Sequence, residues 1–458
     1  MRQSFSCRLA DYPVLVAAAA WIVLSGAAWA QDPLASNNGL YPSDNWRGRF
    51  LLANLDYPEQ PEQKGWPFRE TAGPLSQETA PEYARRLKAY LGLTLGTLVD
   101  SPDDWDPVKA GWYDMVWSGE GTVAGGVTDP TSGREALMNT YSGQIMPAVT
   151  FPEGQAPQGP VQNHAVIYYN APAAAMLGRV WANLYAPNLK AVSFPEGSVV
   201  TKVEAVTNTP EDWPVLENTS VWHVFRPTTE DQLAGGPNLR PHVLPVRPLQ
   251  MAVRVKDSAA APGSGWVFAV FVYDKDAPGL SAWERFVPLG LQWGNDPEVT
   301  GPRADRFGRA AIRQSWINPA APAFTRETFG WGGRLSGPMD VSSRHNVILP
   351  SGERYVNDQH VNASSCQSCH GTAEFPRAAN LYPSPNRSFP RDDLPFLLYE
   401  PGSPDWMRWF QNRPGSEPMT RSAGIVALDY DMALMFAVSA YNEVAGNARL
   451  EQETVDVH

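Results

Sequence analysis

The sequence is short of several features that common protein classes require. It has only three cysteines in 458 residues, too few for a scaffold built on disulfides. It has 36 Lys and Arg against 48 Asp and Glu, and the formal net charge of −12 disfavours nucleic acid or an anionic membrane surface as a partner. It also lacks a G-x-G-x-x-G motif, a phosphate-binding loop and an H-E-x-x-H motif, which argues against dinucleotide-binding folds, P-loop enzymes and zinc proteases.

The N-terminus has the features of a secretory signal peptide at residues 1–30. Arg2 and Arg8 form a positive n-region, a short apolar run follows, and Ala-Trp-Ala precedes Gln31 as a cleavage site. A retained membrane anchor is the alternative, but this run is shorter than the roughly 20 residues that a bilayer span needs, and no later stretch is apolar enough. Cleavage would remove Cys7, so the mature chain would hold two cysteines and no disulfide.

The middle of the chain predicts an α+β fold with an antiparallel, β-rich core. With 43% hydrophobic residues, the chain can bury the core of one large or two ordinary domains. Alternating residues at 249–256 predict a half-buried strand, and apolar runs at 265–274 and 286–293 predict central strands. A short helix at 171–184 and a strand at 198–206 precede them. Strands in series after one helix favour this class over a doubly wound fold.

These patterns divide the chain into four parts. After the signal peptide, residues 31–150 are predicted to be loop-rich, with one amphipathic helix at 81–98 where apolar residues recur at helical spacing. Residues 151–335 are predicted to form the β-rich core domain. Residues 336–458 are predicted to be a mostly helical region that binds a cofactor.

The cofactor follows from the two remaining cysteines. Cys366-Gln-Ser-Cys369-His370 is a C-x-x-C-H motif, the attachment signature of c-type haem. Thiols three residues apart on one helical turn can each add to a haem vinyl group, while the adjacent imidazole reaches the iron as proximal ligand. A thioredoxin-like redox pair and half a zinc site are alternatives, but the chain has no second C-x-x-C and no βαβ pattern around the motif. We therefore expect one covalent haem c, held by Cys366 and Cys369, with His370 on the iron.

A methionine that could complete the iron coordination lies in the last part of the chain. Ser403 and Pro404 predict the start of a short helix, and a longer helix is expected from about residue 429. Met419 lies between them in a proline-rich loop, where a small cytochrome c presents its axial thioether. Other late methionines lie at the helical spacing typical of packing. Met419 is thus the candidate distal ligand.

At this point the chain resembles known families. Residues 360–446 resemble a class I-like cytochrome c module, with C-x-x-C-H-G, a loop, a Pro-Met pair at Met419 and a closing helix. Three earlier stretches resemble the β-core of the cytochrome P460 and beta-type cytochrome c-prime family: FPEGSVVTK at 194–202, MAVRVKD at 251–257 and GWVFAVF at 265–271. The whole mature chain is also similar to a group of long bacterial periplasmic monohaem cytochrome c proteins.

The two resemblances imply different chemistry at the iron. In the first, Met419 closes the sixth position and leaves an electron carrier. In the second, the distal site is open to a small molecule such as nitric oxide or hydroxylamine. Cytochrome P460 also has a lysine cross-linked to its haem, and the resemblance implies Lys202 for that role, although strand lysines are commonly just solvated. A second imidazole from His345 or His360 is a further alternative for the sixth position.

The function expected from the sequence is one-electron transfer by a periplasmic c-type cytochrome. The alternative is a P460-like haem enzyme or gas-binding protein with an open distal site acting on a small nitrogen compound. In a third hypothesis, the β-rich domain binds a partner or substrate and the haem exchanges electrons with it. The acidic chain predicts a redox partner protein with a basic docking patch, no nucleic acid, and no membrane span once the signal is cleaved.

Overall fold

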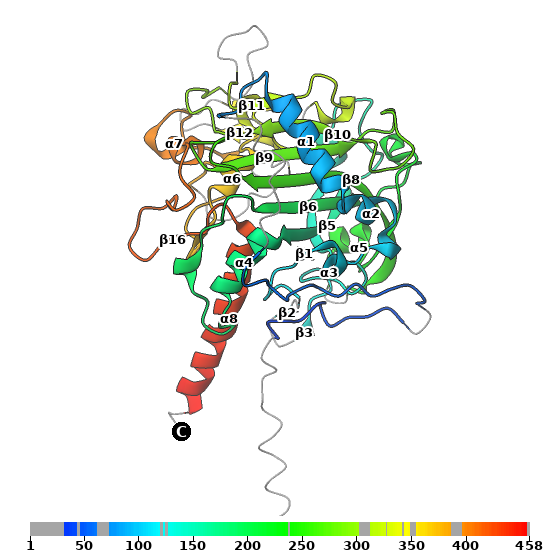
Figure 1. Cartoon of the computed structure of the whole chain (residues 1–458). Helices are drawn as coiled ribbons and strands as arrows, with labels where there is room; N and C mark the ends of the chain where they lie inside the picture. Colours follow the sequence, from blue (N-terminus) through cyan, green and yellow to red (C-terminus); the bar gives the residue numbers. More distant parts are fainter. Residues whose placement is uncertain are drawn as a thin grey trace, which may run out of the picture.

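One large antiparallel sheet organises the fold (Figure 1). Its strands are β1 (Trp112–Tyr113), β4 (Tyr141–Met146), β5 (Val161–Asn170), β6 (Val199–Val206), β7 (Trp222–Arg226), β8 (His242–Lys256), β9 (Trp266–Tyr273), β10 (Phe286–Gln292) and β11 (Ser315–Ile317). They lie in the order β1-β5-β6-β8-β9-β10-β11, with β4 beside β5 and β7 beside β8, and each pairing is antiparallel. The α+β class with an antiparallel core is therefore confirmed, with strands where the alternation and the apolar runs predict them.

The computed structural model describes most of the chain. The described residues are 32–43, 46–61, 73–119, 122–123, 127–236, 239–301, 312–326, 328–340, 343–348, 354–385 and 396–455. The predicted signal peptide at residues 1–30 and its cleavage site lie outside these ranges.

The two faces of the sheet are buried by different parts of the chain. Successive residues of a strand point to opposite faces. On one face, Val203 and Val253 pack in a cluster with helix α1 (Ala80–Gly92), which crosses the front of the sheet in Figure 1. On the other face, Val200 and Phe268 pack in a cluster with residues that follow position 365. The region with the C-x-x-C-H motif therefore covers the face opposite α1.

The N-terminal helix is shorter than predicted. Instead of one helix at 81–98, the structure has α1 and then α2 (Leu95–Asp100). The break follows Gly92, which lies against the indole of Trp283, so closely that a Cβ at this position would be 2.8 Å from Nε1. The helix therefore breaks after a glycine, a residue that destabilises helices, although the helical spacing continues in the sequence.

The remaining elements before position 336 are short. They are α3 (Pro107–Ala110), β2 (Thr122–Val123), β3 (Val127–Thr128), α4 (Ala171–Val180) and α5 (Thr229–Ala234), together with 3-10 turns. Helix α4 begins where the sequence predicts it, with the Asn170 side chain accepting a hydrogen bond from the N–H of Ala173 (3.2 Å). It ends four residues earlier than the predicted 171–184.

The C-terminal part contains strands as well as helices. The strands are β12 (Ser343–Ile348), β13 (Arg354–Asn362), β14 (Glu374–Phe375), β15 (Phe396–Leu397) and β16 (Val426–Ala427); the helices are α6 (Cys366–His370), α7 (Pro404–Phe410) and α8 (Met432–Val455). Strands β13, β12 and β15 form a second sheet, and β14 pairs with β16. The predicted start of α7 is confirmed, because the Ser403 side chain caps it by accepting from the N–H of Trp406.

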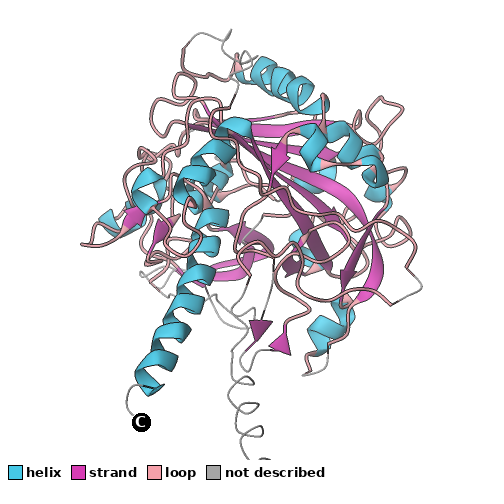
Figure 2. Cartoon of the chain, turned by 60° about the horizontal axis from the view of Figure 1, so that its bottom comes forward, coloured by secondary structure: helices cyan, strands magenta, loops and turns pink. Residues whose placement is uncertain are grey.

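Helix α8 extends away from the sheet in both views (Figures 1 and 2). Its first turns pack against the large sheet through residues such as Leu434 and Met435. Among the helices of the described residues, none has the length and apolar character needed to cross a membrane.

Candidate haem site

The C-x-x-C-H motif forms the short helix α6, and two serines fix where it starts. The Ser365 side chain accepts a hydrogen bond from the N–H of Ser368, and the Ser368 side chain accepts one from the N–H of Ser365 (2.7 Å). This reciprocal capping box satisfies two donors that a helix start leaves open. Because residues three and four apart share one side of a helix, Cys366, Cys369 and His370 lie along the same edge of α6.

Gln292, the last residue of β10, docks α6 on the large sheet. Its side-chain carbonyl accepts from the N–H of Gln367 (3.0 Å), and its amide donates to the Ser365 hydroxyl (3.1 Å). Gln292 is fully buried. Losing these bonds would leave buried polar groups unsatisfied, at a cost of about 1–3 kcal/mol. The sheet therefore fixes the place of α6.

The thiols and the imidazole lie on the more open side of α6. Gln367 and Ser368 are buried, whereas Cys366, Cys369 and His370 are half-buried. Burial raises the pKa of both thiols, that of Cys369 to about 12, so both are neutral at pH 7. A redox-active cysteine works as the thiolate. This environment argues against a thioredoxin-like pair.

The His370 ring is held in a single tautomer. Its Nδ1 lies 2.9 Å from the backbone carbonyl oxygen of Tyr430. A carbonyl only accepts hydrogen bonds, so Nδ1 carries the proton and Nε2 presents its lone pair. Burial, assisted by the charge of Arg254, lowers the pKa of His370 to about 4, and the ring is neutral at pH 7. A neutral imidazole fixed by a carbonyl at one nitrogen has the form in which histidine binds iron through the other.

One transverse row of the large sheet holds both α6 and the segment that carries Tyr430. The row runs across five strands through Tyr169, Val200, Arg254, Phe268 and Gln292, each opposite the next. The Tyr169 hydroxyl donates to Asp431 (3.1 Å), and the Phe268 ring centroid lies 5.2 Å from that of His370. The imidazole and its hydrogen-bond acceptor are therefore positioned by the same row of side chains.

Lys202 belongs to a charged cluster near the cysteines. Its Nζ lies 2.6 Å from Glu204 Oε1 and 2.9 Å from Asp340 Oδ1. The Gln250 amide donates to both Glu204 and Asp340, which closes the cluster. The charges of Asp340 and Lys202 both act on the Cys369 thiol. Glu204 is fully buried, while the Lys202 and Asp340 side chains are 32% and 29% exposed, so the cluster opens to solvent through these two.

Met419 packs elsewhere. Its side chain is buried in an aromatic cluster with Trp331, Trp406 and Phe410, whereas Cys366 packs with the clusters on the two faces of the large sheet. The next residue links this loop to strand β14, which follows α6: the Thr420 N–H and hydroxyl both donate to Glu374, at 2.7 and 2.6 Å. The structure thus places Cys366, Cys369 and His370 on one edge of α6, with the charge of Lys202 acting on Cys369, and buries the Met419 thioether in a separate cluster.

The structure places the other candidates for the sixth iron position only in part. The Met432 sulfur lies 4.0 Å from Cys369 Sγ, at the start of α8. His345 and His360 lie on the paired strands β12 and β13, and their side chains fall outside what the structure describes. Tyr430, which accepts from the His370 ring, and Arg254 and Asp431, which are linked to it, were not candidates in the sequence.

His164, on β5, is a buried histidine outside this site and carries a prediction about acid stability. It is fully buried, neither ring nitrogen has a hydrogen-bond partner among the residues that the structure describes, and burial lowers its pKa to about 3. In the unfolded chain a histidine takes up its proton near pH 6.5. The unfolded state therefore gains protons first as the pH falls, and this residue alone should reduce the free energy of unfolding by about 2 kcal/mol between pH 7 and pH 5.

The variant His164→Leu should lose that part of the acid sensitivity. Denaturant unfolding of the purified protein at pH 7 and pH 5 would measure it, with His223→Leu, a change at an exposed position on β7, as the matched control. If His164→Leu and the control lose the same stability between the two pH values, His164 is not held neutral in the folded protein.

Within the described residues, no three His, Cys, Asp or Glu side chains gather as they would around a bare metal ion. The groups on α6 instead fit haem c: two neutral thiols and one imidazole with a free nitrogen on the same edge of one helix. No protein-family model matches the chain, and a search of curated proteins gives no match.

Proposed function

We propose that this protein is a monohaem c-type cytochrome that transfers single electrons. Cys366 and Cys369 would hold the haem covalently, and His370 would be its proximal iron ligand. The observation that carries the proposal is the hydrogen bond between His370 Nδ1 and the Tyr430 carbonyl, which leaves Nε2 free on the edge of α6 that carries both thiols. When bound, haem supplies a one-electron ferric–ferrous couple.

The chain's own residues would set the conditions for that couple. Gln292 and the Ser365 cap fix α6, Phe268 lies against the imidazole, and the Tyr430 carbonyl fixes its tautomer. We further propose that residues 336–458 are the haem-binding region and that the protein works in the periplasm after removal of residues 1–30. The net charge of −12 supports a partner with a basic docking patch.

The proposal is tested on the wild-type protein, produced with its own N-terminus in a bacterium that has a cytochrome c maturation system. The band on a denaturing gel should stain for haem peroxidase activity, because thioether bonds survive denaturation. The absorption spectra of the oxidised and dithionite-reduced protein should change reversibly. Periplasmic protein that is folded and carries no covalent haem would contradict the proposal.

A second candidate is a P460-like enzyme or gas-binding protein that acts on a small nitrogen compound. It is favoured by the cluster of Lys202, Glu204 and Asp340 near Cys369, which opens to solvent, and by the place of Met419 in a different cluster. In this case the distal position would be open. Rapid binding of carbon monoxide to the reduced wild-type protein would distinguish it from a six-coordinate carrier.

A further inference from the structure

The carbonyl oxygen of Tyr430 accepts two hydrogen bonds, and the second comes from a charged residue. The first is from His370 Nδ1 (2.9 Å). The second is from Nη1 of Arg254, on β8 of the large sheet. The other terminal nitrogen of Arg254 lies 2.7 Å from a carboxylate oxygen of Asp431, with both side chains almost fully buried. Arg254 therefore bridges Tyr430 and Asp431, one residue apart in the chain.

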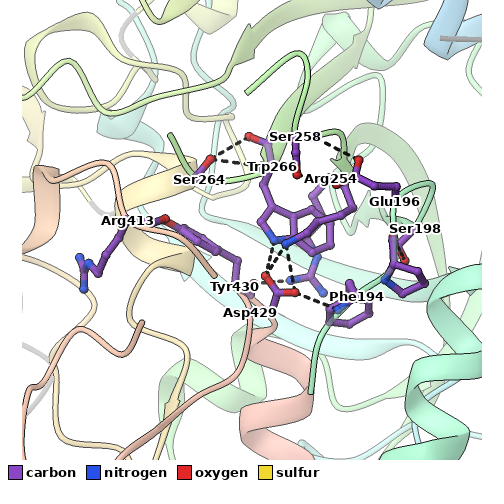
Figure 3. Close-up of polar contacts among 12 residues, drawn as sticks. Phe194, Glu196, Ser198, Arg254, Ser258, Ser264, Trp266, Arg413, Asp429 and Tyr430 are labelled. Atoms are coloured by element: carbon purple, nitrogen blue, oxygen red, sulfur yellow. Dashed lines mark hydrogen bonds and ion pairs between the residues drawn. The ribbon is translucent and has the colours of Figure 1, made fainter. Parts of the chain in front are cut away.

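The backbone around Tyr430 is held in a conformation that needs support. Asp429 and Tyr430 have φ values of 47° and 64°, in the left-handed region that non-glycine residues rarely adopt, at a cost of order 1–3 kcal/mol each. The Asp429 carboxylate accepts hydrogen bonds from the Trp266 indole (2.7 Å) and the N–H of Phe194 (2.9 Å), both drawn in Figure 3, and from Lys256 (2.8 Å). The segment 429–431 is thus anchored at three successive residues.

We propose that Arg254, oriented by Asp431, is a positioning residue that raises the reduction potential of the haem by sharing the Tyr430 carbonyl with His370. The inference rests on the proposed function, because it assigns His370 to the iron. Beyond that function, it assigns control of the reduction potential to a residue on β8 of the large sheet.

The direction follows from competition for one acceptor. A second donor on the Tyr430 oxygen withdraws electron density, so the carbonyl accepts more weakly from His370 Nδ1. The imidazole then keeps less of the imidazolate character that stabilises ferric iron. The guanidinium charge favours ferrous iron in the same direction, and the carboxylate of Asp431 offsets part of this effect.

The experiment measures the reduction potential of the purified holoprotein by redox titration. Arg254→Met removes both the donor and the charge and should lower the equilibrium constant of reduction about tenfold, which is about 59 mV for one electron. Arg254→Lys keeps a charge and a donor and should restore part of the loss. The Asp431 side chain also accepts from the N–H of Leu434 (2.9 Å) at the start of α8, a bond that Asp431→Asn can keep. This variant frees the charge of Arg254 and should raise the potential.

Lys256→Met is the matched control. Lys256 lies two residues along the same strand and pairs with Asp429, so its loss changes the charge equally but removes no hydrogen bond to the Tyr430 carbonyl. It should lower the potential by distinctly less than Arg254→Met. The inference is overturned if Arg254→Met shifts the potential no more than Lys256→Met, or if Asp431→Asn and Arg254→Met shift it in the same direction. Failure of the proposed function would be seen separately, as absence of covalent haem in the wild type.

Discussion

Replacing Cys366 and Cys369 together by Ala is expected to abolish covalent haem binding. Haem peroxidase staining should disappear from the protein band on a denaturing gel, and each single variant should keep at most one thioether and a weaker stain. The two half-buried thiols are the free cysteines of the described chain, and they share one edge of α6 with His370. Stain that persists in the double variant would remove the basis of the proposed function.

The same variant should also show which part of the fold depends on the haem. Without haem, α6 keeps its cap and its bonds to Gln292, but the open side of Cys366, Cys369 and His370 loses a large apolar contact. We expect limited proteolysis to begin within residues 336–427 and to leave the large sheet protected. The start of α8 should stay with the sheet, because Leu428 and Leu434 pack in the cluster with Phe268.

The matched control for this digestion is the wild-type holoprotein under the same protease. It should resist cleavage in residues 336–427 for longer than the double variant. Equal resistance of the two proteins along the whole chain would contradict a separate haem-dependent region, and would show that the C-terminal part is held by its contacts with the sheet alone.

The sequence predicted the sheet because its strands are marked by strong local patterns. Residues 265–274 are a nearly continuous apolar run, and 266–273 form β9, which is buried on both faces. The alternation at 249–256 was also correct for β8. It was misleading about one point: Arg254 and Lys256 were on the face expected to be polar and solvated, and the structure covers this face with residues 429–431. Alternation shows that two faces differ, and it does not show what covers the polar one.

The candidate site was predictable only where its residues are adjacent in the sequence. Cys366, Cys369 and His370 are close because one helical turn brings them together. Tyr430 is 60 residues from His370 and contributes a backbone oxygen. Every residue has such an oxygen, so the residue type does not predict this role. Arg254 is 176 residues from Tyr430. The contact between Arg254 and Tyr430 depends on the register between strands and on the docking of a C-terminal segment. Local sequence patterns predict neither of these.

Met419→Ala is expected to change the haem from low-spin to high-spin if Met419 is the sixth ligand. The variant should bind carbon monoxide when reduced and should have a lower potential, because a soft thioether favours ferrous iron. In the structure the thioether is buried among Trp331, Trp406 and Phe410, so ligation requires it to leave this aromatic cluster. The absorption spectrum of the oxidised protein, before and after the substitution, measures the outcome.

Met407→Ala separates ligation from packing. Met407 packs against the same aromatic cluster as Met419, so its loss should reduce stability in that cluster and leave the spin state unchanged. If Met419→Ala behaves like Met407→Ala, Met419 is a packing residue. Met432→Ala then becomes the decisive variant, because the Met432 sulfur lies 4.0 Å from Cys369 Sγ.

If the wild-type protein is already high-spin and binds carbon monoxide or nitric oxide rapidly, no methionine occupies the sixth position. The electron-carrier proposal would then be replaced by the P460-like one. The distal group would be sought on the large sheet, first at Lys202, whose amine is held by Glu204 and Asp340 and whose side chain is partly exposed. Lys202→Met should then change the rate of ligand binding, while in a six-coordinate carrier it should leave the spectrum unchanged.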